Sequence, residues 1–152
     1  MPNQIPVVNY IINIIEDTYY WINNSKEHII IINEFVNEGI IKVDDEVVSN
    51  LNLIYDSYEQ FIIRLDNLKE YAVNGQKQFK FFMNLCFNTL KVLQSISNND
   101  ISFIGLLSDL DKIHNKSLYL LIVSHITIEQ RYSLEILSAN INRITGLGFV
   151  NL

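Results

Sequence analysis

The segment Leu118–Ile144, LYLLIVSHITIEQRYSLEILSANINRI, contains neither Gly nor Pro and repeats its apolar residues at the spacing of a helix. When successive residues are placed about 100° apart around a helix axis, one narrow polar stripe emerges. The stripe consists of Ser124, Arg131, Glu135, Ser138 and Asn142. The opposite, mainly apolar side carries Leu118, Leu121, Ile122, His125, Glu129, Tyr132, Ile136 and Ala139. We therefore predict a long helix whose core-facing side includes His125 and Glu129.

The composition of the whole chain is that of one folded domain rich in helix. Its 152 residues are 49% hydrophobic and 18% charged, which predicts a single domain over residues 1–152 with one sizeable core. Only five Gly and two Pro interrupt the chain, and this scarcity favours long helices over a fold with many turns.

Charge and cysteine content limit the classes of partner and compartment. The net charge of −6 and the scattered 11 Lys and Arg residues argue against nucleic-acid binding. Polar residues interrupt the apolar N-terminal stretch, so we predict neither a signal peptide nor a membrane partner. A single cysteine, Cys86, allows no internal disulfide and lies in an apolar run typical of an inert core thiol. These features together predict a cytoplasmic protein.

Three further helical segments precede the quoted one. The spacing predicts a helix from about Pro6 to Glu38, with a break near Glu16–Thr18 as an alternative, stopped by Gly39. A second helix begins at the N-cap candidates Asp44 and Asp45 and ends at Asn74-Gly75.

A third helix has its apolar seam at Phe79, Phe82, Cys86, Thr89, Leu93 and Ile96 and closes at 97–100, SNND. The segment 101–115 is less regular, with a short helix around Ile104–Leu110. Four helices joined by short connections predict an all-α fold, an antiparallel up-down-up-down four-helix bundle.

Polar side chains near the predicted seams are candidates for a metal site. His28 lies on the inner side of the first helix, Glu59 at the edge of the second helix's apolar face, and His125 and Glu129 on the last helix. Because first and last helices can be neighbours in such a bundle, His28, Glu59, His125 and Glu129 are the predicted ligands of iron, manganese or zinc. The alternative is a buried His–Glu pair that satisfies only itself, with Tyr132 or Tyr58 completing the hydrogen bonds.

Several of these residues resemble an uncharacterised ferritin-like family found mainly in spore-forming Gram-positive bacteria. The stretch YYWINNSKEHIIIINEFV is similar to that family's opening helix, with its aromatic pair (Tyr20-Trp21), Glu-His pair (Glu27-His28) and apolar run Ile29–Ile32. Phe79-Lys80 matches a Phe-Lys pair in its third helix. SHITIEQRYSLEIL resembles its fourth-helix signature, in which His125 and Glu129 match the motif's His and Glu.

The resemblance implies a ferritin-like bundle with metal-binding capacity, and the chain departs from it at two positions. Ser124 stands where the family prefers Asp, and Ile128 where it prefers Arg. Family members contain two bundle halves and this chain has room for one, so the resemblance implies a homodimer. A di-iron centre with Glu-x-x-His on two helices is not expected, because the predicted helices contain no such motif.

A non-enzymatic structural or protein-interaction bundle is the alternative function. The Ile- and Asn-rich composition also suits viral and phage proteins, some of which are small helical bundles. In the run Ile29–Ile32, four consecutive apolar residues cannot all face one core. Ile30 and Ile31 are therefore expected to contact something else, most simply a second subunit.

Overall fold

The chain forms four long helices. The computed structural model describes residues 5–75, 78–113 and 117–147. The helices are α1 (Ile5–Asn37), α2 (Asp45–Asn74), α3 (Phe79–Ile113) and α4 (Ser117–Gly146), and the described residues contain no strand. The all-α prediction is confirmed. Within the described residues, no helix is long and apolar enough to cross a membrane.

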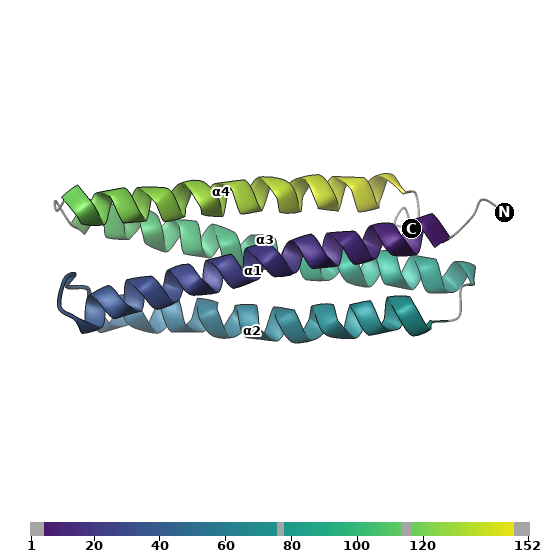
Figure 1. Cartoon of the computed structure of the whole chain (residues 1–152), viewed down its shortest axis with the longest axis horizontal. Helices are drawn as coiled ribbons and strands as arrows, with labels where there is room; N and C mark the ends of the chain where they lie inside the picture. Colours follow the sequence, from purple (N-terminus) through teal and green to yellow (C-terminus); the bar gives the residue numbers. More distant parts are fainter. Residues whose placement is uncertain (1–4, 76–77, 114–116, 148–152) are drawn as a thin grey trace.

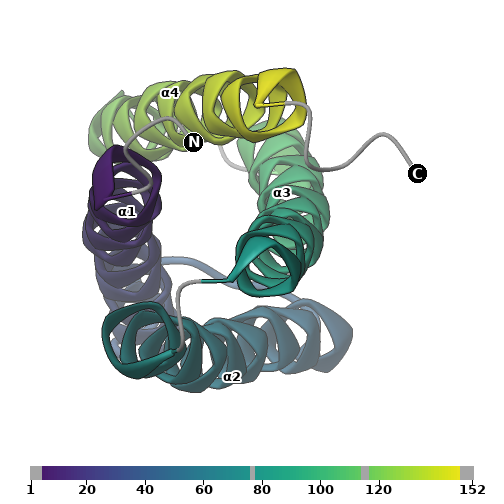
Figure 2. The same cartoon turned by 90° about the vertical axis from the view of Figure 1, so that its right-hand side faces the viewer.

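The helices pack lengthwise around a shared interior. The α1–α2 connection lies at one end of the assembly, and α2 ends and α3 begins at the other (Figure 1). Seen end-on, α1, α2, α3 and α4 follow one another around the interior, so that α4 lies beside both α1 and α3 (Figure 2). One apolar core draws residues from all four helices.

The first two predicted helices are confirmed, and each buries one mainly apolar seam along its length. The buried residues of these seams are Ile11, Ile15, Thr18, Ile22, Ser25, Ile29 and Ile32 on α1, and Leu51, Ile54, Tyr58, Phe61, Leu65, Leu68 and Ala72 on α2. The alternative of a break near Glu16–Thr18 does not occur, because α1 is continuous and the Thr18 hydroxyl donates to the Ile14 carbonyl inside it. Ile30 and Ile31 are exposed, as the run of four predicted.

Polar pairs along the α1/α2 seam keep one constant register. The pairs are Tyr19–Asp66, Glu16–Lys69, Lys26–Glu59 and Asn33–Asn52. In every pair the two residue numbers add up to 85, so a residue later on α1 always meets a residue earlier on α2. Exposed ion pairs contribute little to stability individually, but this set matches the register that the buried seam requires.

The predicted end of the third helix is wrong. Residues 97–100, SNND, do not close α3, which continues without interruption to Ile113 and includes the expected short helix around Ile104–Leu110. The reason is tertiary: Asp100 is fully buried and accepts hydrogen bonds from other helices, while Asn99 donates to the Ile54 carbonyl of α2 at 3.2 Å. At the helix start, Phe79 is exposed rather than part of the seam.

The predicted rotation of α4 is also wrong. Its buried residues recur in steps of three and four at Val123, Ile126, Gln130, Ser133, Leu137, Asn140 and Ile144. The predicted core-facing residues His125 and Tyr132 are exposed, whereas the predicted polar stripe is exposed as expected. The helix is apolar on more than one side, and the polar side chains of Gln130 and Ser133 point inward where other helices supply partners. The side chains of Leu118 and Leu121, like His114 and Asn115, lie outside the described residues.

Two glycines shape the connections between helices. Gly39 has a φ of +69°, a left-handed conformation that suits the predicted stop after α1. Gly75 follows α2 with extended backbone, and its amide donates to the Tyr71 carbonyl at 2.9 Å. A Cβ at position 75 would lie 2.0 Å from the Phe81 ring and 2.7 Å from the Tyr71 carbonyl oxygen. Close approach of α2 and α3 therefore requires glycine there.

Replacing Gly75 with alanine is expected to lower the free energy of unfolding by about 1–3 kcal/mol, because the buried Phe81 ring must move. Gly105→Ala is the matched control. Nothing lies within 4 Å of a Cβ there, and alanine favours the interior of α3 by up to about 1 kcal/mol. Urea denaturation followed by circular dichroism measures both, and equal stability of the two variants would contradict this account of the connection.

Candidate functional site at the seam of the first and fourth helices

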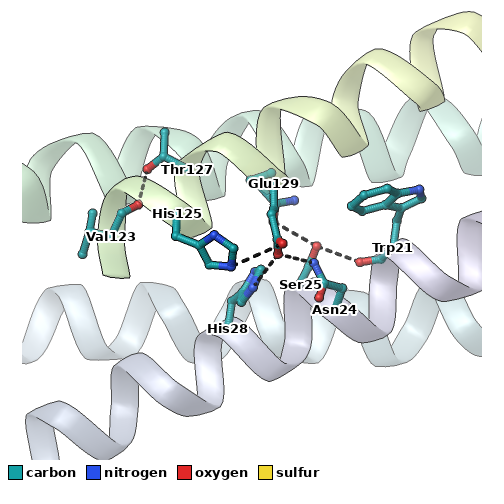
Figure 3. A network of polar contacts seen from close by, with 9 residues as sticks. Trp21, Asn24, Ser25, His28, Val123, His125, Thr127 and Glu129 are labelled. Carbon is teal, nitrogen blue, oxygen red and sulfur yellow. Dashed lines mark hydrogen bonds and ion pairs between the residues drawn. The ribbon is translucent and has the colours of Figure 1, made fainter. Parts of the chain in front are cut away.

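Glu129 is the centre of a polar cluster between α1 and α4. One carboxylate oxygen, Oε2, lies 3.1 Å from His28 Nε2 and accepts a hydrogen bond from Asn24 Nδ2 at 3.1 Å. The other, Oε1, lies 3.3 Å from His125 Nε2 one turn earlier on α4. Figure 3 shows both imidazole rings directed at this carboxylate, one from each helix. Three of the four predicted ligands are therefore brought together.

The two histidines occupy different environments. The His28 side chain is 7% exposed and that of His125 is 66% exposed, with Glu129 between them at 34%. Burial lowers the pKa of His28 below its usual value, although the nearby Glu129 carboxylate opposes this shift. His28 is thus held neutral, with Nε2 as the donor to Glu129. Its buried Nδ1 has no hydrogen-bond partner within the described residues.

Glu59 is not part of this cluster. Its carboxylate is half exposed and forms an ion pair with Lys26 across the α1/α2 seam. Because Lys26 and His28 leave α1 in different directions, a residue of α2 that meets Lys26 is directed away from Glu129. Sequence spacing placed Glu59 near an apolar edge correctly, but it could not tell which neighbour that edge would face.

The arrangement is that of hydrogen bonds rather than of metal coordination. Within the described part of the chain, no group of three or more His, Cys, Asp or Glu side chains is placed to hold a metal ion. The His28 and His125 ring centroids are 6.4 Å apart. Two imidazoles on one tetrahedral zinc, with bonds of about 2.0–2.1 Å, would have centroids roughly 5 Å apart. A metal would therefore require the exposed His125 side chain to move closer to His28.

A second polar network lies next to this cluster, inside the core. Tyr58 of α2 donates to Asp100 Oδ1 at 2.6 Å, and Ser133 of α4 donates to Asp100 Oδ2 at 3.0 Å. Gln130 Nε2 donates to the Tyr58 hydroxyl at 3.3 Å, and Ser25 of α1 donates to Gln130 Oε1 at 3.0 Å. All four helices therefore contribute to one buried polar layer. The two networks adjoin because Asn24 and Glu129 precede Ser25 and Gln130 in the chain.

The buried layer contains an ionisable group without a cation. Burial raises the pKa of Asp100 to about 6, although hydrogen bonds from Tyr58, Ser133 and Gln130 act in the opposite direction. Burial and the Asp100 carboxylate raise the pKa of Tyr58 well above its usual value, so this hydroxyl keeps its proton and remains a donor. The sequence analysis did not predict this layer, because Asp100 belongs to the stretch SNND, whose composition is typical of a helix end.

Aromatic and aliphatic side chains cover the outside of the α1/α4 seam. The Trp21 ring meets the Tyr132 ring edge-on at a centroid distance of 5.4 Å, and Tyr20 meets Trp21 at 5.2 Å. Tyr20, Ile128 and Tyr132 are 65%, 67% and 55% exposed. We call Tyr20, Trp21, Ile128 and Tyr132 the seam patch. The sequence pattern assigned Tyr132 to the core-facing side of its helix, and the observed rotation of α4 places Ile128 and Tyr132 at the surface instead.

The free energy of unfolding should depend on pH through Asp100. Its folded pKa of about 6 exceeds an unfolded value of about 3.9, so the folded state binds more protons between these values. Stability contributed by protonated Asp100 is therefore lost as pH rises from about 4 to about 6, by about 2–3 kcal/mol. The lowered pKa of His28 has the opposite effect: below the usual pKa of histidine, the free energy of unfolding rises with pH.

Comparing Asp100→Asn with the parent chain isolates the Asp100 contribution, because His28 is present in both. The variant should gain stability relative to the parent as pH rises from 4 to 7, in denaturation curves recorded at each pH. If the difference in the free energy of unfolding between the two proteins did not change with pH, the prediction would be contradicted, because Asp100 would then have the same pKa in the folded and unfolded states.

Comparison with known proteins returned no match: no protein-family model matches this chain, and neither a curated protein nor a solved structure does.

Proposed function

We propose that this chain is a non-enzymatic helical bundle that acts through protein association, and that the seam patch binds a second copy of the chain. The observation that carries the proposal is the exposure of Tyr20 and Tyr132, whose rings both contact Trp21 across two neighbouring helices, with the exposed Ile128 one turn before Tyr132. Tyr and Trp are the residues that contribute most often to binding energy at protein interfaces. Apolar side chains grouped on a surface, unlike single ones, indicate an interaction site.

A second copy is the occupant that the charges of the seam favour. Among the described side chains that are joined across α1 and α4, Glu129 is the one acid, and the Asn24 amide and two imidazoles lie within 3.3 Å of its carboxylate. In a twofold dimer, the same patch of each subunit contacts that of the other, so an uncompensated charge would lie opposite a charge of the same sign. The four side chains of the seam patch are uncharged, so contact between two copies of the patch would place no like charges opposite each other. The exposed Ile31 on α1 supplies further apolar surface on the same helix.

We also propose the topology of the bundle, its relationship to ferritin-like proteins and its location in the cell. An antiparallel up-down-up-down arrangement is supported by the constant register of the α1/α2 pairs and by connections that alternate between the two ends. A ferritin-like relationship is supported by the positions of His28, His125 and Glu129 in the fourth-helix and first-helix resemblances. The cytoplasmic location rests on the lone, buried Cys86, whose pKa burial raises to about 11.

Analytical ultracentrifugation of the parent chain and a Tyr20→Ser, Tyr132→Ser double variant tests self-association. We expect a dimer for the parent and at least about a tenfold weaker association for the variant, since interface aromatics commonly contribute more than 1 kcal/mol each. Leu53→Ser on α2, 61% exposed and outside the seam patch, is the control and should associate like the parent. A parent chain that stays monomeric at every concentration would contradict the proposal.

A metal-binding function is the second candidate, favoured by the convergence of two imidazole nitrogens on one carboxylate. His28, His125 and Glu129 would supply a two-histidine, one-carboxylate site for zinc, iron or manganese at the surface end of the cluster. The orphaned Nδ1 of His28 and the freedom of the exposed His125 ring are compatible with a rearrangement that admits an ion.

Elemental analysis of untagged protein that is purified without a chelator tests whether these side chains form a metal site or only a hydrogen-bonded cluster. A metal site predicts about one ion per chain in the parent, retained in Glu59→Gln and lost in His125→Ala and Glu129→Gln. Glu59→Gln is the matched control because Glu59 pairs with Lys26 away from the cluster. Metal-free parent protein that also fails to bind added zinc would exclude this second function.

A further inference from the structure

A groove on the α3/α4 face shares Ile128 with the seam patch but otherwise has a different chemical character. It has a volume of about 320 Å³ and is lined by Leu107 and Ser108 of α3 and by Val123, Ser124, Thr127, Ile128 and Arg131 of α4. The lining combines an apolar wall with hydroxyls and one cation. A site of this size with a few polar groups on an apolar wall is typical of small-molecule binding.

Arg131 has no partner for its charge within the described residues. Elsewhere Lys26 pairs with Glu59 and Lys69 with Glu16, while Arg143 lies 3.5 Å from the Asn140 amide oxygen. Glu135, one turn after Arg131 on the same exposed stripe, forms no ion pair with it. Asp109, the residue after Ser108 on α3, has an interaction of its own. The guanidinium therefore keeps its planar set of donors available at the mouth of the groove.

Among the residues that the structure describes, the hydroxyls of the two groove serines, Ser108 and Ser124, are not used in bonds to the backbone of their own helices. Ser95 and Ser102 of α3 donate to carbonyls four residues earlier, which is the usual way for a helical serine to satisfy its hydroxyl. Ser108 and Ser124 make no such bond within the described part of the chain. Their hydroxyls can therefore donate into the groove from its two opposite walls.

We propose that this groove binds a small amphipathic anion. A carboxylate, sulfonate or phosphate group would accept hydrogen bonds from Arg131, Ser108 and Ser124, and its apolar part would pack on Leu107, Val123 and Ile128. Arginine suits oxyanions because its N–H groups match two acceptor oxygens at once. In a chain of net charge −6, an anion is repelled by most of the surface, so an unpaired guanidinium decides where it binds.

Fluorescence titration with anilinonaphthalene sulfonate, an amphipathic anion, tests the site in the full chain. We expect saturable binding to the parent and an affinity about tenfold or more weaker in Arg131→Gln. Arg143→Gln, which removes the same charge elsewhere on α4, should bind within about twofold of the parent. Ser108→Asp is a second variant that places a carboxylate on the α3 wall and should also abolish binding.

The neutral analogue N-phenylnaphthylamine separates charge recognition from general apolar binding, and its affinity should not change in Arg131→Gln. Amide NMR shifts on addition of the sulfonate should centre on residues 107–108 and 123–131. Sulfonate binding that survives in both Arg131→Gln and Ser108→Asp, or shifts centred on the seam patch, would overturn the proposal. Absence of any binding to the parent would overturn it as well.

Discussion

The buried carboxylate of Asp100 constrains the structure more than any other single group. A carboxylate removed from water must be hydrogen-bonded, and its two oxygens accept from Tyr58 of α2 and Ser133 of α4. Gln130 and Ser25 extend the same layer to α1. These bonds join side chains of all four helices, and they form only when these side chains lie at the same level and face inward. Helices that pack only through apolar side chains can slide past one another at little cost. The hydrogen bonds of this layer, in contrast, favour a single register of the helices.

The rotation of α4 follows from that layer and has consequences on its outer surface. Because Gln130 and Ser133 face inward, Glu129 lies at the rim, and His125 and Tyr132 lie further out. From the core to the surface of the α1/α4 seam, the order is therefore the buried layer, the Glu129 cluster and the seam patch. The same rotation presents Ser124 and Arg131 to the α3 side, where they line the groove.

Regular apolar spacing predicted α1 and α2 well, because each has one dominant apolar side that determines its orientation. It failed for α4, which carries apolar residues on several sides, and for the middle of α3. There the run SNND has the composition of a helix stop, yet Asn99 and Asp100 find their partners on other helices. The candidate site was predicted in its residues His28, His125 and Glu129, but not in its depth, and Glu59 faces another neighbour.

The sequence by itself determined four long helices, a single apolar core and the pairing potential of a histidine and a glutamate one turn apart. These properties depend on spacing along the chain, which is local information. Only the tertiary structure decided which side of α4 is buried, that Asp100 lies in the core, and that aromatic residues remain on the surface. Those outcomes depend on which side chains meet across helices, because a buried polar group is tolerated only where another helix brings its partner.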